Sequence, residues 1–341
     1  GDKNEARKKM SKLGLPILPG SGVLLSPAEA LQAAEEIGYP VMVKAVAGGG
    51  GRGMRVVALA GEMSHAFETA QQEAQAAFGA PDVYIEKYVA SPRHIEFQIL
   101  ADHHGKVVHL GERECTIQRR HQKLLEESPS TQISADSRRE MGHSVVEALK
   151  QVGYTNAGTV EFIMDEKRNL YFLEMNARIQ VEHPVTEMVT GLDLVKRQIE
   201  IAAGQPLNMP GETIGLRGHA IECRVTAENP ETFAPSAGKI TGFNTPGSTG
   251  VRLDTAAYAE AVIPPYYDSL IAKLVVHGSD RAEAISRMRR ALEMFIIEGI
   301  STSIPLHQKI IADPDFRAGR FDTHFLEKFS RNEAGRRAHG S

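Results

Sequence analysis

The stretch Glu174-Met-Asn-Ala-Arg-Ile-Gln-Val-Glu-His-Pro184 decides how the chain is interpreted, because polar and apolar residues alternate through it. In an extended backbone, side chains two residues apart lie on one face. We expect Met175, Ile179 and Val181 to be buried on one face, although a solvated strand can alternate by chance. On the other face, carboxylates, an amide and a guanidinium would hold a metal ion and a small anion together. The polar residues are Glu174, Asn176, Arg178, Gln180 and Glu182.

Upstream, the apolar, β-prone runs on either side of the polar segment 165–169 predict a β-hairpin. If its turn is centred just after Lys167, Glu161 lies directly opposite Glu174. Two carboxylates in such positions repel each other unless a cation neutralises them. With Asn176 they offer only oxygen ligands, which favours Mg²⁺ or Mn²⁺ over zinc. The alternative is a frayed hairpin with both carboxylates in water.

A second signal is the glycine-rich run 48–53, which separates predicted strands at 41–46 and 54–59. Glycines let backbone N–H groups approach phosphate closely. No Gly-Lys-Ser/Thr follows and a strand replaces the helix, which excludes a Walker A loop and a dinucleotide fingerprint. We expect a hairpin whose glycine tip folds over a nucleotide; a mobile tip without a ligand is the alternative. Lys44 in the first strand is interpreted as a phosphate ligand rather than a snorkelling edge residue.

Other segments have structural interpretations. Ser26-Pro-Ala-Glu29 predicts a helix with a capping box, which Gly38 ends. Asp102–Gly105 is interpreted as a hairpin turn rather than a metal site. A helix is expected over Asp280–Glu298, with an apolar stripe facing the core. The stripe consists of Ile285, Met288, Leu292 and Phe295, and the solvated face carries Arg287, Arg289 and Arg290.

The chain resembles the biotin carboxylase subunit or domain of biotin-dependent carboxylases, within the ATP-grasp superfamily. The resemblance extends from the first residues to about residue 328. Its most specific part is Gln118–Lys123 together with Glu174–Pro184. It implies a ligase that makes carboxybiotin from ATP, bicarbonate and biotin borne on a carrier protein. The other matching runs are Gly48–Arg55, Glu86–Tyr88, Arg93-His94, Glu222–Arg224 and Pro264–Asp268.

The resemblance implies roles for individual residues. Phosphate or nucleotide contacts would be Lys3, Lys44, His121 and the flap glycines Gly48, Gly49, Gly50, Gly51 and Gly53. The adenosine pocket would consist of Glu86, Lys87, Val89, His94 and Gln118. Two Mg²⁺ or Mn²⁺ ions would be held beside ATP by Glu161, Glu174 and Asn176. The bicarbonate cradle would consist of Lys123, Arg178, Gln180, Val181 and Glu182. Glu182 would be the base that deprotonates bicarbonate, and Arg224 would stabilise the biotin enolate.

The implied fold is α/β (α+β): an ATP-grasp domain over residues 1–204, with a flap lobe at about 19–88. A biotin carboxylase C-terminal domain would follow at 205–329, then a polar tail at 330–341. Because the family normally begins with a Rossmann-like domain and this chain starts where that domain would end, we expect a truncated chain.

The resemblance also implies partners. A biotin carboxyl carrier protein is expected as a separate chain, because no Met-Lys-Met acceptor motif occurs here. Carboxyltransferase subunits would complete a larger complex such as acetyl-CoA carboxylase. The family homodimer is doubtful in a truncated chain, and Arg252, which matches a dimer-contact position, would then be a surface residue.

Composition is that of an ordinary cytosolic enzyme. The 341 residues suggest about two domains, and a net charge of −4 gives no nucleic-acid footprint. Cys115 and Cys223 are too few for a disulfide framework, which favours a reducing compartment. No apolar run is long enough to span a membrane, and nothing resembles a signal peptide. The rival interpretations are another acyl-CoA or pyruvate carboxylase, another ATP-grasp ligase, and a nucleotide-binding module without turnover.

Overall fold

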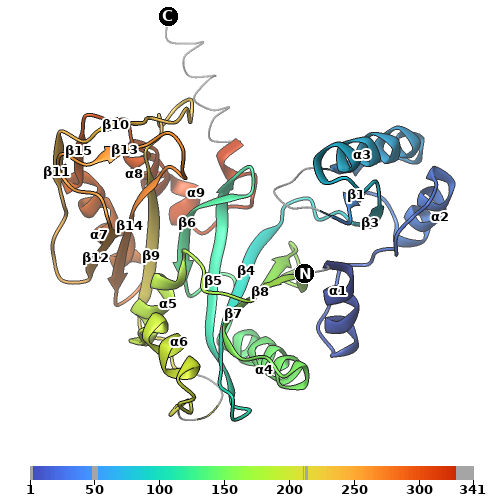
Figure 1. Ribbon diagram of the computed structural model, residues 1–341, viewed down its shortest axis with the longest axis horizontal. Helices are drawn as coiled ribbons and strands as arrows, with labels where there is room; N and C mark the ends of the chain where they lie inside the picture. Colours follow the sequence, from blue (N-terminus) through green and yellow to red (C-terminus); the bar gives the residue numbers. More distant parts are fainter. Residues whose placement is uncertain (1–2, 48–52, 210, 212–213, 328–341) are drawn as a thin grey trace, which may run out of the picture. The chain divides into compact units, whose positions relative to one another are not determined.

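The computed structural model describes residues 3–47, 53–209, 211 and 214–327. They divide into two compact units, whose elements are shown in Figure 1. Unit 1 consists of residues 1–92, 120–122 and 161–175, and unit 2 of residues 93–119, 123–160 and 176–341. Each unit is described by itself, and the domain boundary after residue 204 stays a prediction.

Unit 1 is built on a three-stranded antiparallel sheet of order β2-β1-β3. The apolar side chains of α2 and α3 and of the strands form one core cluster, which includes Ala34, Val43, Phe67 and Ile85. The elements are α1 (Lys3–Lys12), α2 (Pro27–Ile37), β1 (Val41–Ala45), β2 (Met54–Val57), η1 (Ala60–Glu62), α3 (Met63–Phe78) and β3 (Val83–Lys87).

Helix α2 begins close to where the sequence predicts. The Ser26 hydroxyl accepts a hydrogen bond from the Glu29 N–H at 3.3 Å, and the C-cap is Gly38. The Glu29 carboxylate, however, accepts from the N–H of Leu25 at 2.9 Å rather than from that of Ser26. The hydrogen bond from the Glu29 side chain is therefore made one residue earlier than in the predicted capping box. The N–H groups of Glu29 and Leu25 both have an acceptor.

The predicted hairpin around the glycine run is confirmed on both sides of its tip. Strands β1 and β2 pair antiparallel, with Lys44 opposite Met54. Gly53 has φ +68°, and a Cβ there would lie 2.9 Å from the Ala45 Cβ, so glycine is required. The second strand ends at Val57, earlier than predicted, because the Glu62 carboxylate accepts the next two backbone N–H groups. Gly48, Gly49, Gly50 and Gly51 lie outside the described residues.

A larger sheet dominates unit 2, with strand order β12-β14-β9-β6-β5-β4-β7-β8 among the described residues. In chain order its strands are β4 (Arg93–Ala101), β5 (Val107–Arg119), β6 (Gln122–Ser128), β7 (Asn156–Met164), β8 (Leu170–Asn176), β9 (His219–Thr226), β12 (Val251–Thr255) and β14 (Leu270–Gly278). The segment 161–175 of β7 and β8 belongs to unit 1.

The helices of this unit include α4 (Ala135–Val152), α5 (His183–Thr190), α6 (Leu194–Ala202), α7 (Arg281–Met294), α8 (Ile304–Ala312) and α9 (Pro314–Arg317). Two small sheets pair β10 (Gly238–Lys239) with β13 (Val262–Ile263), and β11 (Gly242–Asn244) with β15 (Ile296–Glu298). Helix α5 packs on β9 and β14, and α7 packs on the same two strands.

Helix α7 differs from its prediction at one end. Asp280 caps its N-terminus, but the helix ends at Met294, and residues 296–298 form β15 because their backbone pairs with β11. The predicted apolar stripe is buried, as expected. Arg287 is not on a solvated face: its guanidinium donates to the His277 carbonyl and to Glu283, whereas Arg289 is 63% exposed.

The Asp102–Gly105 segment is a turn, as predicted. The Asp102 carboxylate accepts the N–H groups of His104, Lys106 and Leu207 at 2.8–2.9 Å, so it organises the loop backbone. These bonds, opposed by burial, lower the pKa of Asp102. Among the described helices, none has both the length and the apolar character that crossing a membrane requires.

Candidate active site

The predicted site residues fall in both units, and each set is described within its own unit. In unit 1, the hairpin turn contradicts the predicted register. The Asp165 N–H donates to the Asn169 carbonyl at 3.1 Å, and Arg168 has φ +66°. The loop therefore holds three residues, with one in the left-handed conformation, and is centred half a residue earlier than predicted. Continued regularly, this register places Glu161 opposite Leu173, one position from Glu174.

The same register explains the packing of the hairpin. Phe162 and Phe172 meet edge to face with ring centroids 6.3 Å apart, which is consistent with a regular continuation of the pairing at the turn. Glu161 is 4% exposed, and Glu174 is half-buried. The turn therefore does not support the direct opposition on which the argument for a cation between the two carboxylates depends. The metal-ligand assignment itself stays a prediction.

The run that follows is not an extended strand. Strand β8 ends at Asn176, the backbone then turns, and α5 begins at His183 with Glu182 as its N-cap. Burial differs from the predicted pattern in the second half of the run: Gln180 and Glu182 are 6% and 2% exposed, whereas Ile179 and Val181 are half-buried. Period-two alternation was misleading here because the polar side chains are the ones that find partners in the interior.

Glu182 lies between two cationic side chains of unit 2. Its Oε1 accepts from Lys123 Nζ at 2.5 Å, and its Oε2 accepts from the Arg224 guanidinium at 2.8 Å. Arg224 also donates through Nε to Glu126 Oε1 at 2.6 Å. Burial alone would lower the pKa of Arg224, but the surrounding carboxylates Glu126 and Glu182 raise it, so its charge is secure. Three residues that the sequence assigns to chemistry are therefore in direct contact.

A buried arginine, Arg113, which has no role among the sequence-based expectations, holds side chains of this cluster in place. Arg113 is fully buried and donates five hydrogen bonds, two of them to Glu96 and Gln98 at 2.6 Å. One of the others reaches Gln180 at 3.0 Å. The available signal in the sequence was the charge-dense run Glu112-Arg113-Glu114 just before Gln118–Lys123.

Glu96, also missed, completes the network. Its Oε1 accepts from Arg113 and its Oε2 accepts from Lys123 at 2.6 Å. Burial raises the pKa of Glu96, but Lys123 and Arg113 outweigh it and hold that pKa well below its usual range. A shared ion network of this kind holds the lysine ammonium at a fixed distance from Glu182.

Glu96, Cys115 and Glu182 offer ligand atoms within 4.8 Å of one another, a spacing that could suit a metal ion. The Lys123 ammonium already lies at 2.5–2.6 Å from both carboxylates. Burial also raises the pKa of Cys115 well above its usual range, which keeps the thiol protonated and a poor ligand. This cluster is therefore bridged by a lysine rather than by a metal.

The remaining cradle residues of unit 2 surround the start of α5. Lys273 Nζ on β14 donates to the Val181 carbonyl at 3.2 Å. Arg178 is exposed, and its guanidinium donates to Asn176 Oδ1 at 3.3 Å and to the Ile179 carbonyl at 3.1 Å. Because the planar guanidinium of Arg178 is exposed and close to Glu182 in sequence, it can turn towards a small anion.

In unit 1, the predicted nucleotide residues form a second charged cluster. Glu86 is 4% exposed and accepts from Lys44 Nζ at 2.5 Å, and its other oxygen contacts the Arg7 guanidinium. Two cations thus share one carboxylate, which leaves a positive balance suited to phosphate. Lys87 instead donates to the Gly38 and Tyr39 carbonyls at 2.9 and 3.0 Å.

Other predicted nucleotide residues are placed as follows. His121 is exposed and Val89 half-buried in unit 1, and Lys3 begins α1. In unit 2, Gln118 is half-buried, whereas His94 is buried with its Nε2 3.5 Å from the Glu96 carboxylate. The structure therefore brings Lys44 to Glu86 in one unit, and His94 into the Glu96 network in the other.

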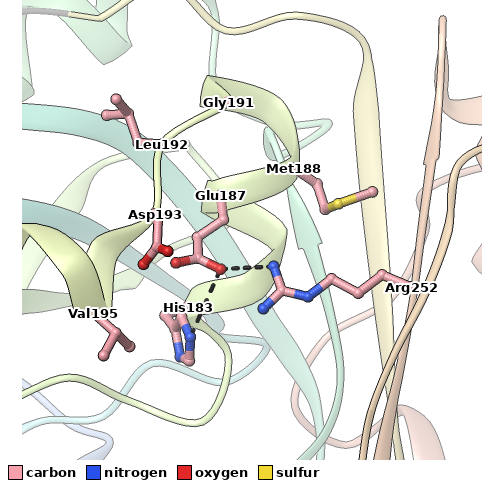
Figure 2. A pocket seen from close by; sticks show the side chains of 8 residues that line it. All are labelled: His183, Glu187, Met188, Gly191, Leu192, Asp193, Val195 and Arg252. Carbon is pink, nitrogen blue, oxygen red and sulfur yellow. Dashed lines mark hydrogen bonds and ion pairs between the residues drawn. The ribbon is translucent and has the colours of Figure 1, made fainter.

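A shallow pocket lies beside α5, on the side of the helix shown in Figure 2. Arg252 reaches Glu187 Oε2 at 2.6 Å and pairs with Asp254 at 2.8 Å, and Glu187 also lies 3.8 Å from His183. The Asp254 and Glu187 partners outweigh burial and raise the pKa of Arg252. The guanidinium predicted to be a dimer contact or a surface residue is thus engaged within its own chain. The pocket is lined by His183, Glu187, Met188, Gly191, Leu192, Asp193, Val195 and Arg252.

Comparisons with known proteins identify the family of this chain. Residues 2–210 match the family described as carbamoyl-phosphate synthase L chain, ATP binding domain, and residues 222–328 match the biotin carboxylase C-terminal domain. A biotin carboxylase from Nostoc is 54% identical over 333 residues, which cover 97% of this chain and 74% of that protein. A pyruvate carboxylase subunit from Methanothermobacter thermautotrophicus is also 54% identical, over 97% of this chain and 68% of its own length.

A solved structure is equally similar. It is the biotin carboxylase domain dimer of the 2-oxoglutarate carboxylase from Hydrogenobacter thermophilus, in complex with MgADP, ADP and bicarbonate. It superposes with a TM-score of 0.91 and 52% identity, and the match covers 96% of this chain and 73% of that one. The ATP-grasp-type match, the C-terminal match and these relatives together show that the chain belongs to the biotin carboxylase family of ATP-dependent ligases.

Proposed function

We propose that this chain catalyses the ATP-dependent carboxylation of biotin by bicarbonate. The observation that carries the proposal is the contact of Glu182 with both Lys123 and Arg224. This contact brings together a proton acceptor (Glu182), a cation that can bind a small anion (Lys123) and a guanidinium that can stabilise an enolate (Arg224). Each of these three groups is needed at a different point of the same reaction.

Glu182 is proposed as the base. Bicarbonate is a weak nucleophile, and a carboxylate within hydrogen-bond reach can take its proton as it attacks. Lys123 and Arg178 would hold the anion, Arg178 through its planar fork and Lys123 as a point charge. Gln180 and Val181 complete the cradle: the side chain of Gln180 is fixed by Arg113, and the carbonyl of Val181 by Lys273.

Arg224 is proposed to stabilise the biotin enolate. The ureido nitrogen of biotin is a poor nucleophile until its proton leaves, and the charge then develops on the ureido oxygen. A charged donor aimed at that oxygen lowers the barrier as an oxyanion hole does. The bond from Arg224 Nε to Glu126 fixes the guanidinium plane and leaves its NH2 edge turned towards the reacting groups.

Glu161, Glu174 and Asn176 are proposed to hold Mg²⁺ or Mn²⁺ beside ATP. Their donor set fits such ions, because it consists only of carboxylate and amide oxygens. A bound divalent ion supplies charge that screens the phosphates. Lys44, next to the buried Glu86, and Lys3, Gly53 and His121 are proposed as further phosphate or nucleotide contacts. Glu86, Lys87, Val89, His94 and Gln118 are proposed for the adenosine end.

The acceptor is proposed to be biotin on a separate carrier protein, within an acetyl-CoA carboxylase that forms malonyl-CoA. Carboxyltransferase subunits, a homodimer and a cytoplasmic location belong to the same proposal. A pyruvate or 2-oxoglutarate carboxylase is a second candidate, because relatives with those names are as similar as the biotin carboxylases. Carboxyl transfer to acetyl-CoA, pyruvate or 2-oxoglutarate, assayed with matching carrier and transferase subunits, separates these assignments.

The central test is ATP hydrolysis by the full chain with bicarbonate, with and without free biotin. We expect hydrolysis that requires bicarbonate and is stimulated by biotin. Another ATP-grasp ligase would show no biotin stimulation, and a binding module would bind ATP without turnover. Either result would contradict the proposal.

The metal assignment has its own test. Glu174→Gln removes a ligand charge and is expected to weaken metal-dependent ATP affinity on the order of tenfold. Glu166→Gln, in the exposed turn of the same hairpin, is the matched control. Superimposable metal titrations for Glu174→Gln and the wild type would refute the assignment.

A further inference from the structure

Two buried carboxyl groups face each other behind Arg224. Glu126 on β6 and Glu222 on β9 are directly opposite in the antiparallel register, and both are 0% exposed. Opposed side chains in such a pair have Cβ atoms about 5 Å apart. Neither residue is assigned a role in the proposed reaction, and two adjacent buried carboxylates are costly unless their charges are compensated.

The hydrogen bonds of the two groups are unequal. Glu126 Oε1 accepts from Arg224 Nε at 2.6 Å, but its Oε2 has no hydrogen-bond partner among the described residues. In the same part of the chain, both carboxyl oxygens of Glu222 lack any such partner. A buried anion without a donor is rare, whereas a protonated carboxyl group brings a donor of its own.

The two lysines near the pair, Lys273 and Lys123, contact other groups. From β14, Lys273 is directed to the Val181 carbonyl and Asp254, and from β6, Lys123 bonds Glu96 and Glu182. Helix α5, which packs on this face, contributes the anions Glu182 and Glu187 and a histidine, His183, whose pKa is lowered by burial. Among the described residues, the hydrogen-bonded cation of the pair is therefore Arg224, which also serves Glu182.

We propose that the pair of Glu126 and Glu222 carries a single proton, which is on Glu222, and that Glu222 thereby acts as a positioning residue for Arg224. The pair then bears one negative charge, on Glu126, which anchors Arg224 Nε. A neutral Glu222 leaves the other face of the guanidinium free for Glu182 and, on the proposed function, for the biotin enolate. Loss of the proton would place a second anion behind Arg224 and draw it away from the reacting groups.

The pKa directions support this charge state. Burial raises the pKa of Glu222 well above its usual range, and the neighbouring Glu126 adds to the rise. Burial also raises the pKa of Glu126 to about 7, although Arg224 opposes the rise. The proton is assigned to Glu222 because Glu126 is the carboxyl that accepts from the arginine.

The first test is infrared spectroscopy of the folded full chain near neutral pH. The wild type is expected to show the carbonyl stretch of a buried protonated carboxylic acid, and Glu222→Gln to lose it. Glu127→Gln is the matched control, because Glu127 is the next residue on β6, is equally buried and is paired with His219 and Arg281. It is expected to keep the band.

A pH titration of the wild-type band needs no variant and covers the case in which Glu222→Gln fails to fold. Absence of the band in the folded wild type, or its survival in folded Glu222→Gln, would overturn the proton on Glu222. Disappearance of the band only on the alkaline side, with the fold intact, would support it.

The second test is the pH dependence of biotin use, and it depends on the proposed function. As pH rises into the alkaline range in which Glu222 loses its proton, kcat/KM for free biotin in the wild type is expected to fall on the order of threefold to tenfold more than in Glu222→Gln. Parallel profiles would overturn the positioning role, even if the infrared band is present. If the wild type has no biotin-dependent activity, the proposed function fails, and the infrared result still decides the carboxyl pair.

Discussion

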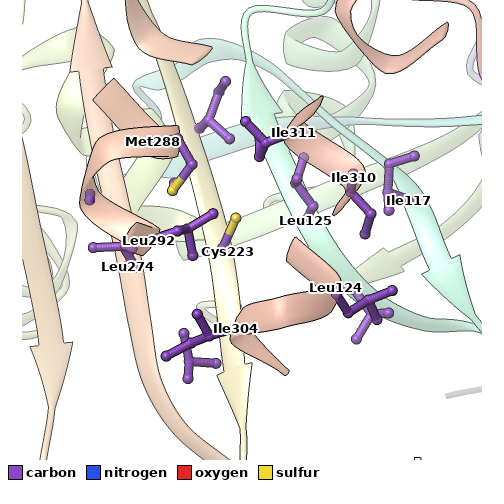
Figure 3. Packing of buried hydrophobic residues seen from close by; sticks show 14 of the residues in the cluster. Ile117, Leu124, Leu125, Cys223, Leu274, Met288, Leu292, Ile304, Ile310 and Ile311 are labelled. Carbon is purple, nitrogen blue, oxygen red and sulfur yellow. The ribbon is translucent and has the colours of Figure 1, made fainter. Parts of the chain in front are cut away.

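The two faces of strands β6, β9 and β14 are stabilised by different interactions. On one face, Leu125, Cys223 and Leu274 are aligned by the register and pack with α7 and α8 in the largest apolar cluster of unit 2, part of which is shown in Figure 3. On the other face, Glu126, Glu222, Arg224 and Lys273 lie beneath α5. Because side chains alternate along these strands, one face carries a large apolar cluster, and the other carries a network of charged side chains beside a smaller apolar cluster.

The two faces should therefore respond differently to substitution. The apolar face is stabilised by close packing. Removing a few methyl groups should therefore lower the free energy of unfolding, by an amount that is nearly independent of pH. The charged face is stabilised only while each carboxylate keeps its cation or its proton. Substitutions there should change activity and pH dependence first. Substitutions on each face can test this contrast.

Glu182→Gln should have the largest effect. The amide cannot accept a proton, so bicarbonate-dependent turnover should fall about 10²- to 10⁴-fold while ATP binding persists. The measurements are steady-state ATP hydrolysis and nucleotide titration. Glu187→Gln, one turn later on α5, is the control and should keep its turnover. Undiminished turnover in Glu182→Gln would remove it from the role of base.

Leu274→Ala should have the largest effect on the apolar face. Leu274 is fully buried among the side chains of α7, so the cavity should cost about 2–5 kcal/mol in the free energy of unfolding. Urea unfolding measures this, and the loss should be the same at acidic and neutral pH. Ile199→Ala, at a 66% exposed position on α6, should cost less than about 0.5 kcal/mol. A strongly pH-dependent loss in Leu274→Ala would break the contrast between the faces.

Glu127→Gln tests a charge at the edge of the apolar face. The His219 and Arg281 contacts overcome burial and lower the pKa of Glu127 to about 2. A lowered pKa contributes stability above the unfolded value of about 4.3, and this is lost as pH falls through about 2. The variant should therefore be less stable by about 3 kcal/mol near neutral pH, and the difference should shrink in acid. Urea midpoints that stay equally far apart at both pH values would contradict the assignment.

Lys273→Met should have the smallest effect. It removes one hydrogen bond, at 3.2 Å, to the Val181 carbonyl and a longer contact with Asp254, and should cost about 1 kcal/mol. The KM for bicarbonate should rise a few-fold with little change in the KM for ATP, because only the cradle loosens. An equal rise in both constants would indicate a general loss of structure instead.

Local sequence was enough for several elements. Ser26 and Gly38 bound α2, the glycine run separates two paired strands, and the stripe along α7 is buried as its spacing predicts. Each of these features depends on residues within a few positions of one another. Where a distant strand competed, as β11 does for residues 296–298, the helical pattern was misleading.

The candidate site shows the same limit. The sequence indicated Lys123, Glu182 and Arg224, which do meet, but it missed Glu96 and Arg113, on which their positions depend. The charged run around Arg113 does not by itself show that the arginine is buried, because its partners come from segments far away in the chain. Only pairing across the sheet shows that this charge is satisfied rather than exposed.

The sequence by itself determined the family, the residue types of the candidate site and local boundaries such as the two ends of α2, because those properties belong to residue types and short spacings. Tertiary structure alone decided that the run after Asn176 leaves the strand, that Gln180 and Glu182 are buried, and that Glu126 faces Glu222. The physical reason is the same in each case. The free energy of a buried polar group depends on the partners that the fold brings to it, and these partners are distant in sequence.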